Sequence, residues 1–142
     1  MAEISPAEGI KVIIEAAAIA SLSDWSIAIG SGLDITDRLI TIKDTGGLPA
    51  NPKWLLDFPA VQIIVRGQAN EYSAIWAVAK TIKDICLGVT SQTISGDRYV
   101  SITIGSDIEF IERDDNQRPT FTLNLRLIIE PQTNANTNRA SL

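Results

Sequence analysis

Apolar and polar residues alternate along several stretches of the chain, which is the two-residue period of β-strands. The longest run covers Arg118–Glu130 and stops at Pro131. Its apolar face would consist of Phe121, Leu123, Leu125, Leu127 and Ile129. A second run, Arg98–Ile104, sets Val100, Ile102 and Ile104 against Tyr99, Ser101 and Thr103. Shorter runs predict three more strands, at Trp25–Ile29, Leu39–Lys43 and Ala60–Gly67.

Two other stretches place apolar residues at helical spacing. The first opens with Ser5-Pro6-Ala7-Glu8, a capping box with proline at the first helical position, and predicts a helix from about Pro6 to Ala20. The second follows Asn70, which we expect to cap it, and ends at Gly88. Its apolar stripe is predicted to contain Tyr72, Ile75, Trp76, Ala79, Ile82 and Cys86.

Together these elements predict an α+β fold in which two helices pack on one face of a mostly antiparallel sheet of about five strands. We expect a single domain over residues 1–131. Residues 132–142 are polar and lack periodicity, so they are expected to form a flexible tail until a partner orders them. The second face of the sheet needs either water or another subunit.

The stretch Leu48–Pro59 interrupts this pattern. It contains three prolines together with two large aromatic residues, Trp54 and Phe58, so it is predicted to be an ordered loop. Large apolar side chains in a loop mark either a contact with another molecule or the end of the domain's own core. The sequence leaves both interpretations open.

Composition narrows the chemistry. The chain has 142 residues, 45% of them hydrophobic, with no histidine, one cysteine and a formal charge of -5. A sizeable core is therefore expected, and mechanisms that need imidazole are excluded. The acidic balance disfavours generic binding to nucleic acids. Because Cys86 is the single cysteine of the chain, no intramolecular disulfide can form, and we expect Cys86 to be a buried core residue.

The apolar run Ile10–Ala20 does not indicate a membrane protein or a secreted one. Lys11 and Glu15 interrupt it, acidic residues precede it, and it is shorter than the roughly 20 residues that a membrane span needs. We therefore expect a protein that is made in a cytoplasm, remains soluble and has no membrane partner.

Candidate catalytic and ligand-binding motifs are weak. Asp44-Thr45-Gly46 matches the tripeptide of dimeric aspartic proteases. A tight turn after a strand is the better explanation, because the retroviral enzymes of that pattern are almost wholly β whereas Asn70–Gly88 is helical. Asp114-Asp115-Asn116 fails the calcium-loop spacing and is typical of a hairpin turn. The glycine pairs lack the lysine of a phosphate loop. We therefore expect no enzyme, metal or cofactor. A small-molecule module remains an alternative, motivated only by Trp25, Trp54 and Trp76.

The order of several short motifs resembles the tail-terminator (minor tail or minor capsid) proteins of tailed bacteriophages. These motifs are Asp44-Thr45-Gly46-Gly47 with a proline-rich loop, Phe58-Pro59-Ala60-Val61-Gln62-Ile63, Arg66-Gly67, a helix bearing Tyr72, Leu87-Gly88, a strand around Tyr99, Arg113-Asp114-Asp115 and Arg118-Pro119-Thr120-Phe121-Thr122-Leu123-Asn124. The resemblance covers roughly residues 5–130.

The resemblance implies a ring, usually a hexamer, that sits on the tail tube, stops its growth and offers a docking surface to neck or head-completion proteins. It further implies a virion location at the tail–neck junction, after synthesis in the host cytoplasm, and a lumen through which phage DNA passes without specific binding. On this basis we hypothesise that interfaces involve Trp54, Phe58, Arg113, Asp114, Asp115 and Arg118. The alternatives are another neck connector or tail-completion protein of the same fold, and a dimeric aspartic protease using Asp44.

Overall fold

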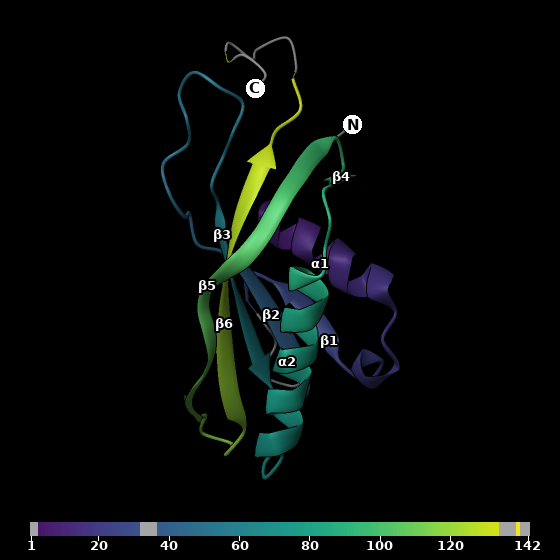
Figure 1. The fold of residues 1–142 in the computed structure, drawn as a ribbon. Coiled ribbons are helices and arrows are strands. Elements are labelled where there is room, and N and C mark those ends of the chain that lie inside the picture. The colour runs from purple at the N-terminus through teal and green to yellow at the C-terminus, as the bar shows by residue number, and fades with distance from the viewer. Residues whose placement is uncertain (1–2, 32–36, 134–138, 140–142) are drawn as a thin grey trace.

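A computed structural model of the chain describes residues 3–31, 37–133 and 139 (Figure 1). Two α-helices, a short 3-10 helix (η1) and six strands follow one another along this part of the chain. Their bounds are α1 Pro6–Ala17, η1 Ala20–Leu22, β1 Ser26–Ile29, β2 Leu39–Asp44, β3 Ala60–Arg66, α2 Tyr72–Leu87, β4 Gln92–Ile94, β5 Asp97–Arg113 and β6 Pro119–Glu130.

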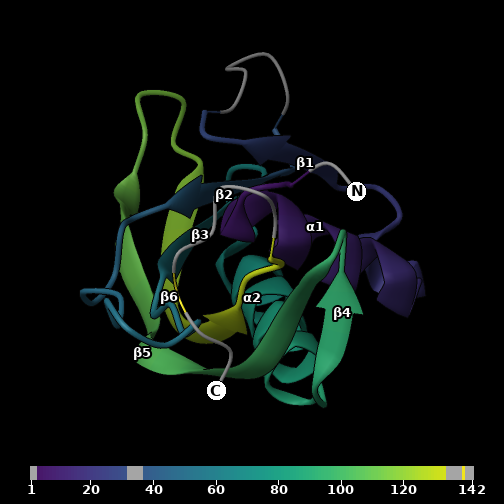
Figure 2. The ribbon, with the colours of Figure 1, turned by 90° about the horizontal axis from the view of Figure 1, so that it is seen from above.

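The strands form one sheet in the order β1-β2-β3-β6-β5-β4. Only β1 and β2 run parallel, and all other neighbours are antiparallel. The sheet curls, and both helices lie inside the curl on the same face (Figure 2). The predicted α+β class is therefore confirmed, with six strands where about five were expected. The additional strand, β4, has three residues, which is too short for alternation to reveal it.

Helix α1 begins as predicted and ends earlier. The Ser5 hydroxyl accepts a hydrogen bond from the Glu8 backbone N–H (3.2 Å), and the Glu8 carboxylate accepts one from the Ser5 N–H (3.2 Å). The capping box is thus confirmed. The predicted end at Ala20 is wrong, because Ala18 adopts a left-handed conformation (φ 49°, ψ 46°) that terminates the helix at Ala17.

Helix α2 also departs from the prediction at its ends. Its N-cap is Glu71, and Asn70 lies outside the helix with a positive φ of 67°. Gly88 has a φ of −81°, so its freedom to adopt positive φ is not used. The buried stripe is Ile75, Val78, Ala79, Ile82 and Cys86. Tyr72 and Trp76, which were predicted to belong to that stripe, are instead 43% and 44% exposed.

Strand β5 is much longer than the predicted Arg98–Ile104, and a register irregularity alters its facing. The pairing with β6 shifts between Tyr99 and Ser101, so one residue is left over on β5. As a result Tyr99 and Ile102 are both buried, although strict alternation would put them on opposite faces. The Tyr99 ring packs against Gly9 of α1 so closely that no other side chain fits there.

The core lies between the two helices and the inner face of the sheet. Strand β6 contributes Phe121, Leu123, Leu125, Leu127 and Ile129, all buried as the alternation predicted. Strand β3 adds Val61, Ile63 and Val65. Cys86 of α2 is fully buried in the same cluster, and this burial raises the pKa of its thiol to about 12. The expectation of a buried core cysteine is therefore confirmed.

Candidate interaction surface

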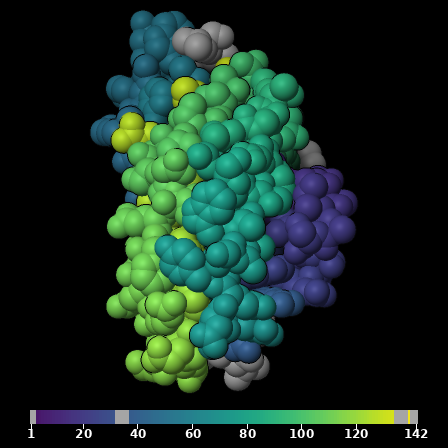
Figure 3. Space-filling view, turned by 60° about the horizontal axis from the view of Figure 1, so that its bottom comes forward, coloured from purple at the N-terminus to yellow at the C-terminus, as the bar shows by residue number. Residues whose placement is uncertain are grey.

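Residues 45–59 join β2 to β3 and project from one end of the sheet, at the end where β6 finishes (Figure 1). We call them the projecting segment. Figure 3 shows it in blue as a lobe beside the rest of the molecule. Its base is held by backbone pairing, because the Leu48 N–H donates to the Phe58 carbonyl (2.9 Å). Asp57 and Ile129 exchange two further backbone hydrogen bonds, of 2.8 and 3.0 Å. The predicted ordered loop is therefore tied to the end of β6.

This projecting segment exposes apolar side chains. Leu48 is 58% exposed, the highest value among the exposed large apolar residues of the described chain. Trp54 and Phe58 are half-buried, while Leu55 is buried and anchors the segment from within. The Lys53 ammonium lies 5.0 Å from the Trp54 ring, within cation–π distance. Both sequence-predicted aromatic residues thus present part of their surface to solvent.

A groove of about 400 Å³ runs between this segment and the sheet. Leu48 and Phe58 line one side, and Thr103, Arg126 and Ile128 line the other. Arg126 is exposed, and no ion pair to it is seen among the described residues. The groove therefore combines apolar walls with one cationic group, which suits a partner segment with an apolar side chain and a carboxylate.

One arginine from the far end of the chain binds the same segment. The Arg139 guanidinium donates to the Trp54 carbonyl through Nε (3.1 Å) and Nη2 (2.7 Å), to the Leu56 carbonyl (2.9 Å) and to Asp57 Oδ1 (2.9 Å). We call these acceptors, on Trp54, Leu56 and Asp57, the arginine site. Nothing in the sequence pattern predicts this contact, because a lone arginine in a polar tail carries no signal for its partner.

The turn between β5 and β6 lies at the opposite end of the sheet and contains four of the predicted interface residues. Asp114 Oδ1 accepts the N–H groups of Asn116 and Arg118, both at 3.0 Å. Its Oδ2 accepts the Arg118 Nε at 2.7 Å. Partial burial raises the pKa of Asp114, but hydrogen bonds from Arg118 and Asn116 and the charge of Arg118 outweigh it, so the pKa lies below its ordinary value.

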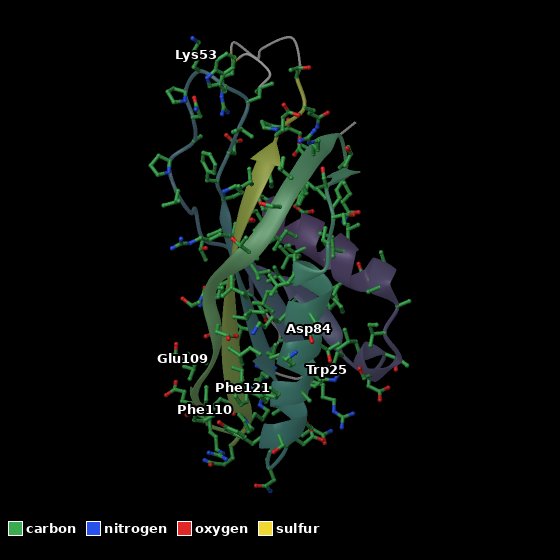
Figure 4. All side chains as sticks on the ribbon, viewed as in Figure 1. Trp25, Lys53, Asp84, Glu109, Phe110 and Phe121 are labelled. Atoms are coloured by element: carbon green, nitrogen blue, oxygen red, sulfur yellow. The ribbon has the colours of Figure 1, made fainter. Side chains whose placement is uncertain are left out.

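Burial separates these four residues into two pairs. The Arg118 side chain is only 3% exposed and also contacts Asp37 at 3.3 Å, so it stabilises the fold and is not accessible to a partner. Arg113 and Asp115 are exposed and available to a partner. Arg113 lies 5.8 Å from the ring of Phe110, which packs on Phe121 at a centroid distance of 5.5 Å (Figure 4). The charged turn is thus backed by an aromatic cluster.

Asp44, the residue of the protease alternative, ends β2 beside helix α1. Its Oδ1 accepts the backbone N–H of Ala7 at 2.9 Å, in the first turn of the helix. A carboxylate there satisfies a free N–H group and is favoured by the helix dipole. The geometry therefore assigns Asp44 a helix-capping role.

The three tryptophans do not share a site. Trp25 lines a groove of about 500 Å³ beside the end of α1, with Ile14 and Ile19. Trp54 lies in the projecting segment, whose tip is marked by Lys53 in Figure 4, well away from Trp25. Trp76 is exposed on α2. This separation removes the motive for a tryptophan-lined small-molecule pocket.

Comparisons with known proteins add little to this geometry. No protein-family model matches the chain, and no curated protein matches it. A crystal structure from Akkermansia muciniphila has 11% identity and a TM-score of 0.40, covering 92% of this chain and 78% of its own. A structure determined without its transmembrane region, from the same organism, has 11% identity and a TM-score of 0.36, covering 90% and 85%. These TM-scores are too low to support an argument.

Within residues 3–31, 37–133 and 139, no helix is both long enough and apolar enough to cross a membrane.

Proposed function

We propose that this protein is a structural virion component that caps the tail tube of a tailed bacteriophage as an oligomeric ring. In this role it ends tube polymerisation and provides the docking surface for neck or head-completion proteins. The starting point is the resemblance to tail-terminator proteins, which rests on the order of short motifs between Asp44 and Asn124. These motifs lie on β2, the projecting segment, β3, α2, β5 and β6. Catalysis has no part in it.

The observation that carries the proposal is the projecting segment with its groove. Leu48 is exposed and Phe58 is half-buried. The segment that carries them projects from one end of the sheet, away from both helices (Figure 1). Apolar side chains held in place on a projection are characteristic of protein–protein contacts. A ring needs a heterologous interface that closes on itself, and a projection with an adjacent groove provides two different surfaces for it.

We further propose that phage DNA passes through the lumen of the ring, and the charge of the chain supports this. The chain carries a formal charge of -5. Glu109, Glu112 and Asp115 are exposed near the β5–β6 turn, and no ion pair to them is seen within the described ranges. Carboxylates that face a lumen repel phosphate, so DNA would slide past without binding.

The test is the assembly state, measured by mass photometry on the purified protein alone and mixed with tail tubes. We expect a hexamer that binds tube ends and shortens tubes when it is added during polymerisation. Leu48→Asp places a charge in the groove and should weaken assembly. Val12→Asp, at a similarly exposed position on α1, is the matched control and should assemble normally.

Two results would count against the proposal. Wild-type protein that stays monomeric at high concentration and with tubes would overturn the ring. Immunogold labelling at the portal side of the neck, and not at the tube end, would instead favour a neck connector of the same fold.

A further inference from the structure

The arginine site uses all three nitrogens of one side chain. Nε and Nη2 both bind the Trp54 carbonyl, Nη2 also binds the Leu56 carbonyl, and Nη1 binds the Asp57 carboxylate. A guanidinium is planar and carries five N–H donors in a fixed fork, so three acceptor groups around one plane select for it. A lysine has a single nitrogen and cannot reach all three acceptors in this way. The site is therefore specific for arginine.

Contacts other than those with Arg139 also hold the acceptors in position. The Asn51 side-chain oxygen accepts the N–H groups of Lys53 and Trp54 at 2.9 and 3.0 Å, which folds the tip of the loop. The Asn51 N–H donates to the Leu56 carbonyl at 3.1 Å. Asp57 is paired with Ile129 through two backbone hydrogen bonds. Because the loop is already organised, little ordering free energy opposes binding of an arginine.

Arg139 carries the only charged side chain among residues 132–142. Residues 132–138 are Gln, Thr, Asn, Ala, Asn, Thr and Asn, without a charge or a large apolar side chain. The Arg139 side chain remains 26% exposed when bound, so it docks on the surface and is not locked into the core. The same segment of another copy presents identical chemistry. An exchange between copies would remake every hydrogen bond, and exchange of identical elements is a low-cost route to association.

We propose that the arginine site is a docking site for the C-terminal segment, filled by Arg139 of the same chain in the monomer and by Arg139 of a second copy in the assembly. This exchange rests on the proposed function only for the existence of an assembly. The arginine site itself does not depend on it. In the ring, each tail would thereby tie its chain to the projecting segment of a neighbour.

The first experiment tests the site by itself. The Arg139→Ala protein has an empty site, and a fluorescent peptide of residues 131–142 should bind to it, as measured by anisotropy. Wild-type protein should bind the peptide weakly, because its site is filled. A peptide with Arg139→Lys should bind about tenfold more weakly or worse. Arg113→Ala protein, which loses an exposed arginine elsewhere, is the matched control and should behave as wild type.

The second experiment tests exchange between copies. Arg139→Ala protein keeps the arginine site but lacks the arginine that fills it. Asp57→Lys protein keeps Arg139, but the lysine in its own arginine site repels that side chain. Their mixture should give heterodimers by native mass spectrometry that neither variant forms alone. Circular dichroism and melting temperature show whether each variant is folded.

The outcomes separate this proposal from the proposed function. Failure of the peptide to bind folded Arg139→Ala protein overturns the arginine site as a docking site. Normal rings formed by Arg139→Ala protein, or a mixture without heterodimers, overturn the exchange and leave the ring intact. A strictly monomeric wild type overturns the ring, and the peptide experiment still decides the fate of the site.

Discussion

The two ends of the sheet are each held by one arginine, in contrasting ways. At the β5–β6 turn, Arg118 is 3% exposed and pairs with Asp114, four residues earlier in the chain. At the projecting segment, Arg139 is 26% exposed and binds groups that lie 82 to 85 residues away in sequence. Arg118 completes the turn and also reaches Asp37, 81 residues earlier, from a buried position, whereas Arg139 joins distant parts of the chain at the surface. Burial therefore separates a stabilising contact from an exchangeable one.

The largest effect is expected from Arg118→Ala. The substitution removes hydrogen bonds to Asp114 and Asp37 and leaves a hole in the turn, so it should lower the free energy of unfolding by about 1–3 kcal/mol. Urea denaturation measures this. Arg113→Ala, in the same turn but exposed, should change it by less than about 0.5 kcal/mol. Equal losses for both variants would contradict the contrast between buried and exposed arginines.

Gly47→Ala should be next, because the projecting segment depends on its backbone path. Gly47 has a φ of 78°, and a Cβ there would collide with backbone atoms of Phe58, Pro59 and Ala60. Gly46→Ala is the matched control, since Gly46 also has positive φ (89°) but has open space around it. Both variants should lose about 1 kcal/mol from conformational strain. Gly47→Ala should lose clearly more stability than Gly46→Ala, which thermal unfolding measures. Identical melting temperatures for the two variants would refute the close approach of Gly47 to the backbone of Phe58, Pro59 and Ala60.

A smaller effect should appear in the pH dependence of folding stability, through Asp114 in the β5–β6 turn. The folded-state pKa of Asp114 lies below its ordinary value, so its carboxylate contributes stability above about pH 4. That contribution is lost as the pH falls through the lowered pKa, because protonation then weakens the contact with Arg118. Asp114→Asn should flatten the acid limb of stability below about pH 4. A steep limb in Asp114→Asn would refute this assignment.

The smallest global effect is expected from Arg139→Ala, which removes a surface contact. The free energy of unfolding should change by no more than about 0.5–1 kcal/mol. Hydrogen exchange should nevertheless accelerate at the Leu56 and Asp57 amides, which lie beside the lost contacts. Arg98→Ala, which removes an exposed pair with Glu130, should leave those amides unaffected. Global destabilisation as large as that of Arg118→Ala would erase the proposed difference between the two ends.

Local signals in the sequence predicted local structure well. The Ser5–Glu8 capping box, the alternation of β6 and the turn at Asp114 each depend on residues within a few positions of one another, and all three are present. Predictions that assumed uniform periodicity were less accurate. Tyr99 is buried beside Ile102 because β5 contains an extra residue, and Trp76 lies at the solvent edge of its helix stripe.

The candidate site shows the same division. The sequence identified Trp54 and Phe58 as unusual loop residues, and both contribute to the projecting segment. It placed Arg118 among the interface candidates, since alternation cannot distinguish a buried ion pair from a surface charge. It did not reveal the arginine site, because that site consists mostly of backbone carbonyls, which every residue possesses.

By itself the sequence determined the α+β class, most element positions, the buried cysteine and the acidic balance, because these follow from short-range patterning and composition. The tertiary structure alone decided the strand order, the curl of the sheet around both helices and the docking of Arg139 on the projecting segment. The strand order depends on pairing between distant strands, such as Ala60 of β3 with Arg126 of β6, and the Arg139 contacts join residues 82 to 85 positions apart. Such long-range contacts are determined by the packing of the whole core and cannot be seen in local periodicity.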